Sequence, residues 1–193
     1  MNRSELKTFA KEQLAGNHFT MIFLMIVFVA VLGICGMIPI VGAIITILIA
    51  SPISLGYLNA NIKLIKGEEI SIGDLFGQMH LFGKSVWLNI QISVFITLWS
   101  LLFFVPGIIK SLSYSAAKYI LIANPELSAG EALKKSMELM DGHKMELFLL
   151  QLSFILWEIL TAITFGVAGF YVIPYMNATM ANFYIKIGAV NKV

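Results

Sequence analysis

The chain has 193 residues, of which 59% are hydrophobic and only 12% are charged, and its mean hydropathy is +0.87. A water-soluble domain carries about a quarter charged residues, and one of this size cannot bury so large an apolar surplus in a single core. A lipid bilayer accommodates that surplus, so we predict an all-α integral membrane protein. The net charge of +2 is small and does not indicate a nucleic-acid partner.

The amino-terminal segment carries charged residues as far as Glu12, and no small-residue cleavage site follows the first apolar stretch. We therefore expect that stretch to stay in the protein as a helix. Six apolar stretches are long enough to cross about 30 Å of hydrocarbon. They cover residues 19–37, 41–65, 84–105, 107–123, 145–165 and 170–187.

Short turns with glycine or proline are predicted at 36–39, at Pro106-Gly107 and at 166–169, and they join the six stretches into three helical hairpins. Most basic residues lie on the side opposite these turns. The positive-inside rule makes that side cytoplasmic, so both termini are expected in the cytoplasm. The basic residues on that side are Arg3, Lys7, Lys11, Lys63, Lys66, Lys84, Lys134, Lys135, Lys144, Lys186 and Lys192.

Three amphipathic segments, at 4–16, 71–83 and 128–142, are too polar to cross the bilayer and are expected as helices on its cytoplasmic surface. Ser71 with Asp74, and Ser128 with Glu131, have the spacing of helix caps, and each segment closes on a glycine. Each surface helix precedes a hairpin. The chain is therefore predicted to be one membrane domain made of three repeats, at about 1–66, 67–124 and 125–193.

Polar residues recur in the second helix of each predicted hairpin. Two interpretations are open: they pack helix against helix, or they line a cavity that faces the cytoplasm. In either case we expect three parallel-oriented hairpins around a pseudo-threefold axis. The residues of this polar stripe are Tyr57, Asn59, Tyr114, Ser115, Tyr175 and Asn177.

Lys110 and Glu158 are charged residues well inside predicted spans, each about 21 Å from the cytoplasmic boundary. Because an uncompensated charge at that depth is costly, we expect the two to form an ion pair. The pair could tie the second hairpin to the third, or it could relay protons or ions. Alternatively, both side chains could extend to the outer interface.

The sequence contains no catalytic or nucleotide-binding motif that we recognise, so we expect a protein that is not an enzyme and has no cofactor. His18, His80 and His143 occupy similar places near the ends of the surface segments. Without a partner Cys or Asp at ligand spacing, they are better interpreted as capping or interfacial residues than as a metal site. Cys35 is alone, so no intrachain disulfide can form.

Several short motifs along nearly the whole chain carry a family likeness. They are Gly73-Asp74-Leu75-Phe76, Pro106-Gly107-Ile108-Ile109-Lys110, Ser113-Tyr114-Ser115, Asn124-Pro125, Gly142-His143-Lys144 and Pro174-Tyr175. The chain resembles the bacterial integral membrane family known as domain of unknown function 975. The resemblance implies a membrane fold and location but no reaction. Ala123 departs from the acidic residue that the family pattern has before Asn124-Pro125.

These features together predict a multi-pass protein of the bacterial cytoplasmic membrane. A non-enzymatic accessory or scaffold role is expected, with membrane lipids, other membrane proteins or further copies of the chain as partners. The alternative is a small transporter or channel that uses Lys110, Glu158 and the polar stripe. A transporter needs a continuous polar path to both sides, whereas a scaffold needs only a dry bundle with an exposed cytoplasmic surface.

Overall fold

The computed structural model describes residues 3–36, 41–102 and 104–190, and within these ranges the chain is all-helical, without a strand. The predicted all-α class is therefore confirmed. The elements are α1 (Arg3–Gly36), α2 (Val41–Lys66), α3 (Gly73–Phe76), the short 3-10 helix η1 (Met79–Leu81), α4 (Phe82–Leu102), α5 (Phe104–Tyr114), α6 (Ala117–Ala123), α7 (Ala129–Leu139), α8 (Lys144–Leu152), α9 (Ile155–Ile163) and α10 (Gly169–Lys186).

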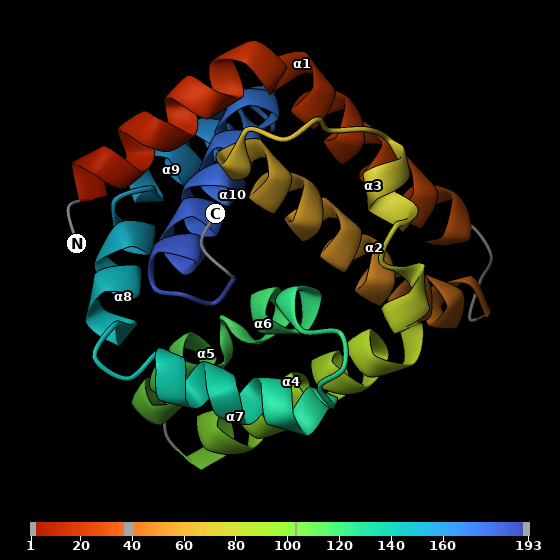
Figure 1. The fold of residues 1–193 in the computed structure, drawn as a ribbon, viewed down its shortest axis with the longest axis vertical. Helices are drawn as coiled ribbons and strands as arrows, with labels where there is room; N and C mark the ends of the chain where they lie inside the picture. Colours follow the sequence, from red (N-terminus) through yellow and green to blue (C-terminus); the bar gives the residue numbers. More distant parts are fainter. Residues whose placement is uncertain (1–2, 37–40, 103, 191–193) are drawn as a thin grey trace.

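The helices form two groups around one centre (Figure 1). Helices α2, α6 and α10 lie closest to the centre and are called the inner helices below. Helices α1, α4, α8 and α9, called the outer helices, lie around them. The inner helices supply much of the buried core, including Ala60, Leu64, Leu121, Ala178 and Phe183. Helix α1 packs along both α2 and α10, so these three helices meet on one side of the molecule.

Three helical segments among the described residues are long and apolar enough to cross a membrane: Arg3–Ile34, Gly73–Leu101 and Lys144–Ile163. They contain the first helix of each predicted hairpin, and their apolar side chains are mostly exposed. The second helices of the second and third predicted hairpins are interrupted or carry polar residues. A turn at Ser115 and Ala116 separates α5 from α6, and α10 carries Asn177, Thr179 and Asn182.

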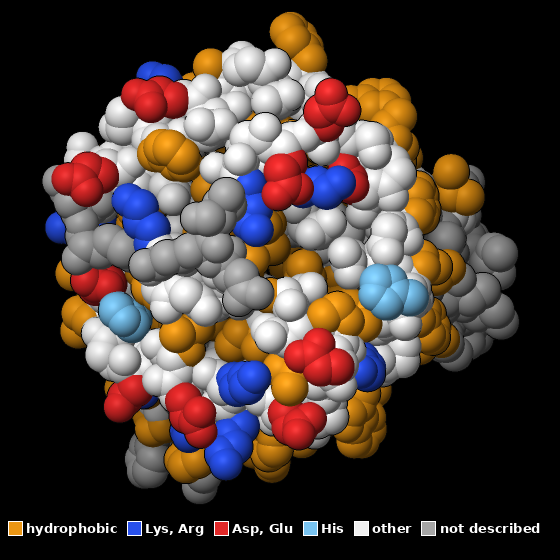
Figure 2. Space-filling view, viewed as in Figure 1, with side chains coloured by type: hydrophobic (Ala, Val, Ile, Leu, Met, Phe, Trp, Pro, Cys, Tyr) orange, Lys and Arg blue, Asp and Glu red, His pale blue; other side chains and the backbone are white. Residues whose placement is uncertain are grey.

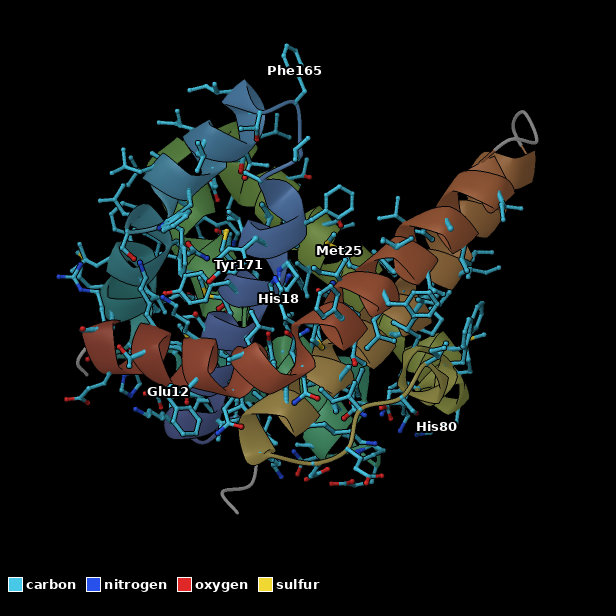
Figure 3. The ribbon with its side chains drawn as sticks, turned by 90° about the horizontal axis from the view of Figure 1, so that it is seen from above. Glu12, His18, Met25, His80, Phe165 and Tyr171 are labelled. Carbon is cyan, nitrogen blue, oxygen red and sulfur yellow. The ribbon has the colours of Figure 1, made fainter. Side chains whose placement is uncertain are left out.

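The structure forms the three predicted surface helices to different extents. The first continues without a break into the first apolar stretch, and Gly16, expected to end it, lies inside α1, which changes direction along its length (Figures 1 and 3). The second is divided into α3 and η1, and Gly83 lies inside α4. The third is α7, with the full capping box between Ser128 and Glu131 and with Gly142 at φ +83° beyond its end.

The predicted turns also differ in outcome. The 166–169 turn is present, with Phe165 at φ 49° and Gly166 at φ 90° between α9 and α10. Pro106 and Gly107 instead lie in the first turn of α5. Proline is tolerated there because the first-turn amides have no partner within the helix. The turn predicted at 36–39 falls largely outside the described residues.

The amino-terminal part of α1 is tied to α8 and α10 by polar contacts. The Lys7 Nζ donates to the Ser153 carbonyl at 3.1 Å and lies 3.9 Å from the centre of the Phe154 ring. The Asn182 Nδ2 donates to the Leu6 carbonyl at 3.1 Å. Figure 2 shows charged side chains gathered on the face seen in Figure 1, with hydrophobic side chains toward its margin. One face of the molecule is therefore polar, and its sides are apolar.

Candidate functional site

A groove of about 760 Å³ lies between α1, α2 and α10, with one residue of α6 reaching into it. This volume falls within the range of small-molecule sites in proteins. The lining is mainly hydrophobic. It consists of Met25, Ile26, Phe28, Val29 and Ala30 of α1, Ser54, Tyr57 and Leu58 of α2, Lys118 of α6, Gly166 of the turn before α10, and Gly169, Phe170, Ile173 and Asn177 of α10.

Two of the polar residues in the groove satisfy their donors within their own helix. The Ser54 hydroxyl donates to the Ser51 carbonyl at 2.7 Å, and the Asn177 amide nitrogen donates to the Ile173 carbonyl at 3.0 Å. Both bonds follow the helix periodicity of three or four residues, which places the preceding carbonyl within reach. The Ser54 hydroxyl donor is therefore used, whereas the Asn177 amide nitrogen keeps a second N–H.

The other two polar residues differ in how their polar atoms are placed. Tyr57 is only 8% exposed, and its hydroxyl is buried beside the side chains of Asn61 and Asn177. Lys118 is partly buried and makes neither a hydrogen bond nor an ion pair with any residue that the structure describes. The ring of Phe28 stacks against that of Tyr57 with centroids 6.0 Å apart, which fixes the tyrosine ring in the groove. The groove thus offers one cationic group, the Lys118 ammonium.

Helix α1 approaches α10 before the groove begins. The rings of His18 and Tyr171 are 4.8 Å apart, and Figure 3 shows them side by side, with Met25 farther along α1. Gly169 has the Thr161 side chain close to the position that a Cβ would occupy. The lack of a side chain at Gly169 therefore allows Thr161 of α9 to pack closely against the start of α10.

The polar stripe is only partly brought together. Tyr57 and Asn177 share the groove, whereas Asn59 lies in a separate pocket with Lys63 and Lys66. The other three residues lie elsewhere: Tyr175 lines a pocket with Lys7 and Lys11, the Ser115 hydroxyl donates to the Leu112 carbonyl at 2.7 Å, and the ring of Tyr114 lies 6.0 Å from that of Phe95.

Lys110 and Glu158 do not form an ion pair in the described part of the chain. The Lys110 Nζ lies 5.0 Å from the centre of the Trp99 ring, a distance typical of a cation–π contact. Glu158 is on the exposed side of α9. The equal depth predicted for the two residues in the membrane therefore does not bring their side chains together.

The three histidines have separate local contacts. His18 contacts Tyr171, the Nδ1 of His80 lies 3.1 Å from the Gly77 carbonyl, and the Nδ1 of His143 lies 2.9 Å from the Glu146 carboxylate. No group of three or more His, Cys, Asp or Glu side chains suited to a metal ion occurs among the described residues.

Sequence reasoning missed Lys118. The residue lies inside the stretch 107–123, so a lysine in an otherwise apolar span was the signal that could have singled it out. Its connection with Tyr57 could not be inferred, because the two lie on helices that are far apart in the chain.

The model of one protein family, described as "Protein of unknown function (DUF975)", matches residues 1–113 and again 105–191. The two matched segments cover nearly the whole chain. No curated protein and no solved structure shows a significant match.

Proposed function

Since the chain belongs to the DUF975 family of proteins of unknown function, we propose its role from its own geometry: a non-enzymatic accessory protein of the bacterial cytoplasmic membrane. In this proposal the chain crosses the bilayer six times as three repeated units, with both termini in the cytoplasm. Its partners are membrane lipids, with other membrane proteins or further copies of the chain as additional candidates.

The observation that carries the proposal is the exposed apolar surface of the outer helices. Large hydrophobic side chains there are freely accessible, among them Ile34 at 67%, Leu101 at 77% and Leu156 at 74% exposed. Soluble monomers rarely leave an apolar area of this extent uncovered, whereas hydrocarbon covers it without cost. The charged face in Figure 2 then suits the water-facing end of the bundle.

The inner helices supply the remaining spans of the proposal. Asn61 and Asn182 are buried on α2 and α10 and donate to the carbonyls of Tyr57 and Leu6. Polar side chains of this kind are compatible with a membrane when neighbouring helices enclose them. Such enclosure explains how α10, with its buried Asn182, can cross the bilayer inside an apolar ring.

An accessory role fits the polar residues better than transport does. Lys110 contacts Trp99 rather than Glu158, and the polar stripe is divided among several places. The groove is lined mainly by hydrocarbon, which suits a lipid-facing site more than an aqueous path.

Single-cysteine labelling in a Cys35→Ser background tests the topology. A membrane-impermeant maleimide is applied to sealed vesicles from either side, with cysteines at Glu126 and Val167. We expect Glu126→Cys to react only from the cytoplasmic side and Val167→Cys only from the outside. Reaction of both from the same side would contradict the six-span arrangement.

The same assay separates the accessory role from transport. Cysteines are introduced at the stripe residues Asn59, Ser115 and Asn177, and at Lys110 and Glu158. The accessory role predicts protection at Lys110 and Glu158 from both sides. Labelling along the whole set would instead reveal a water-filled path and favour a transporter.

A further inference from the structure

A pocket of about 610 Å³, called the α1 pocket below, lies beside the first turns of α1, where this helix crosses α10 (Figure 3). Unlike the groove, it is lined by side chains that carry hydroxyl, ammonium and carboxylate groups. They include Lys7, Thr8, Lys11 and Glu12 of α1 and Tyr175 of α10, and Ala15 lies among them. This lining suits a charged occupant, and the arrangement of the charges determines its sign.

The two lysines of the α1 pocket project from almost the same side of the helix. Successive residues of an α-helix are about 100° apart around its axis, so Lys7 and Lys11 differ by about 40°. Glu12, the acidic residue of the lining, lies about 100° from Lys11 and forms no ion pair with either lysine. The two ammonium groups therefore share one side of the pocket without a carboxylate to neutralise them. An anion placed between them would offset their mutual repulsion.

Lys7 is held in position by contacts that leave part of its ammonium group free. One of its three donors binds the Ser153 carbonyl, and the ammonium lies above the Phe154 ring, at the junction of α8 and α9. The Phe154 ring in turn packs edge-on against Tyr175, with centroids 5.4 Å apart. At least one donor of Lys7 therefore remains for an occupant. Lys11 is exposed and makes no hydrogen bond or ion pair with any residue that the structure describes.

The surroundings of the α1 pocket favour a lipid over a free ion. The first turns of α1 belong to the predicted surface segment at 4–16, which lies at the depth of the lipid head groups in the proposed arrangement. Close to the carbonyl that binds Lys7, α8 ends and α9 begins with exposed apolar side chains, those of Leu152, Ile155 and Leu156. The phosphate of a phospholipid can occupy the pocket while its acyl chains cover such side chains. A free phosphate would gain only the polar contacts.

The charge of the lining favours a lipid with a net negative charge. Lys7 and Lys11 outweigh Glu12. Arg3 lies one turn before Lys7 and adds a further positive charge, and its guanidinium donates to the Leu149 carbonyl at 3.4 Å. Phosphatidylglycerol brings one negative charge to these groups. Phosphatidylcholine brings the same phosphate together with a quaternary ammonium group, which the lysines repel.

We propose that the α1 pocket binds the phosphate of an anionic phospholipid from the cytoplasmic leaflet, with Lys7 and Lys11 as its cationic donors. The Thr8 hydroxyl lines the same pocket and supplies a neutral donor. The inference rests on the proposed function, because that function places the start of α1 at the cytoplasmic surface, and it names a lipid class for the accessory role. A lipid bound there contacts α1 through its head group and the junction of α8 and α9 through its chains.

The test uses the full chain in micelles of a neutral detergent, titrated with phosphatidylglycerol or with phosphatidylcholine of the same acyl chains. Native mass spectrometry counts the lipids that each protein molecule retains. We expect one phosphatidylglycerol to bind about fivefold more tightly than phosphatidylcholine, the effect of one basic residue at an anionic membrane surface. Equal affinities would overturn the proposal. Inorganic phosphate should not displace the lipid, and complete displacement would show that the pocket takes the free ion instead.

Variants assign the binding to the α1 pocket. Lys11→Ala should weaken the binding of phosphatidylglycerol about fivefold and reduce the preference over phosphatidylcholine. Lys134→Ala is the matched control, because Lys134 is another exposed lysine of a predicted surface segment and lies on α7, outside the pocket. It should bind like the wild type. Equal losses in the two variants would indicate a diffuse attraction to the charged face and would overturn the pocket.

A third variant fills the pocket without changing its charge. Ala15 is exposed and lines the pocket, so Ala15→Trp should occupy part of its volume and weaken the binding of phosphatidylglycerol at least as much as Lys11→Ala does. Wild-type binding by a folded Ala15→Trp variant, judged by its elution on gel filtration, would overturn the proposal. If the variants do not fold, the comparison of the two lipids on the wild-type protein decides the question.

The outcomes separate this inference from the proposed function. A protein with the expected six-span labelling but without a preference for phosphatidylglycerol would disprove only the lipid site. Failure of the topology assay would disprove the membrane arrangement itself.

Discussion

The outer and inner helices of this molecule differ in how side-chain polarity relates to burial. Leu156 on α9 is 74% exposed, whereas Asn182 on α10 is 2% exposed. In a water-soluble protein such exposure of leucine side chains would be a liability, and buried amides would be exceptions. The comparison shows that burial does not follow side-chain polarity in this bundle, because α10 buries an amide while α9 leaves a leucine exposed.

The largest expected effect comes from deleting a buried inner side chain. Phe183 on α10 is fully buried and packs edge-on against Tyr184 at 5.3 Å between ring centroids. Phe183→Ala should lower the free energy of unfolding by about 3 kcal/mol, because it leaves a cavity. Unfolding by sodium dodecyl sulfate in mixed micelles measures the change.

The matched control for this prediction is Phe165→Ala in the turn before α10. Phe165 is 98% exposed and points away from the molecule in Figure 3. The same substitution there should change stability by less than about 0.5 kcal/mol. Similar losses at Phe165 and Phe183 would break the distinction between the two groups of helices.

The second effect concerns the close approach of α2 to α3. A Cβ at Gly56 would collide with the Leu75 carbonyl, and backbone cannot rotate away as a side chain can. Gly56→Ala should therefore cost about 2 kcal/mol through overpacking. Gly33→Ala on the exposed part of α1, where nothing lies within 4 Å, should be neutral or slightly stabilising in the same unfolding assay.

A smaller effect is expected at the start of α7. Ser128 accepts from the Glu131 amide, so Ser128→Ala should cost about 1 kcal/mol of stability. Ser71→Ala is the control, because Ser71 contributes only its backbone amide to the Asp74 carboxylate and keeps that bond after substitution. Equal losses at the two serines would contradict the assigned cap.

The same cap predicts a pH dependence. Hydrogen bonds from the Ser128 side chain and amide hold the pKa of Glu131 below its usual 4.5. A carboxyl with a lowered pKa in the folded state contributes stability above its unfolded pKa and loses it as pH falls through the folded value. The protection factors of the α7 amides, which are exchange rates divided into the intrinsic rates at the same pH, should therefore fall below about pH 4.5, and Ser128→Ala should weaken that dependence.

The smallest predicted effect lies at the contact between α10 and the amino-terminal part of α1. Asn182→Ala removes the bond to the Leu6 carbonyl and should cost about 0.6 kcal/mol, typical of a polar contact between membrane helices. Asn177→Ala should cost less, because its amide nitrogen bonds only within α10. Unfolding in mixed micelles resolves this difference if replicate measurements agree within about 0.2 kcal/mol.

Local chemistry made part of the fold predictable from the sequence. The capping box of Ser128 and Glu131 needs only residues three apart, and the turn before α10 needs only its glycines. The exposed apolar helices follow from hydropathy alone. In contrast, Gly16 and Gly83 permit a helix end without requiring one, and at both places the helix continues.

The candidate site was less predictable, because it depends on the direction in which each side chain points around the axis of its helix. Lys110 and Glu158 were placed at equal depth, yet Lys110 faces Trp99 on α4. Tyr57 and Asn177 were identified as polar repeats, but their place beside Lys118 results from the packing of three helices distant in the chain. A single sequence gives depth and periodicity, but not which faces meet.

The central claim is that the outer helices face lipid and enclose the inner ones, and spin labels in reconstituted vesicles test it directly. Labels at Leu156 and Leu101 should collide often with oxygen, which concentrates in hydrocarbon, and rarely with a water-soluble nickel chelate. A label at Ala178, which is fully buried on α10, should show reduced collisions with both reagents. Frequent nickel collisions at Leu156 and Leu101 would contradict a membrane location for the outer helices.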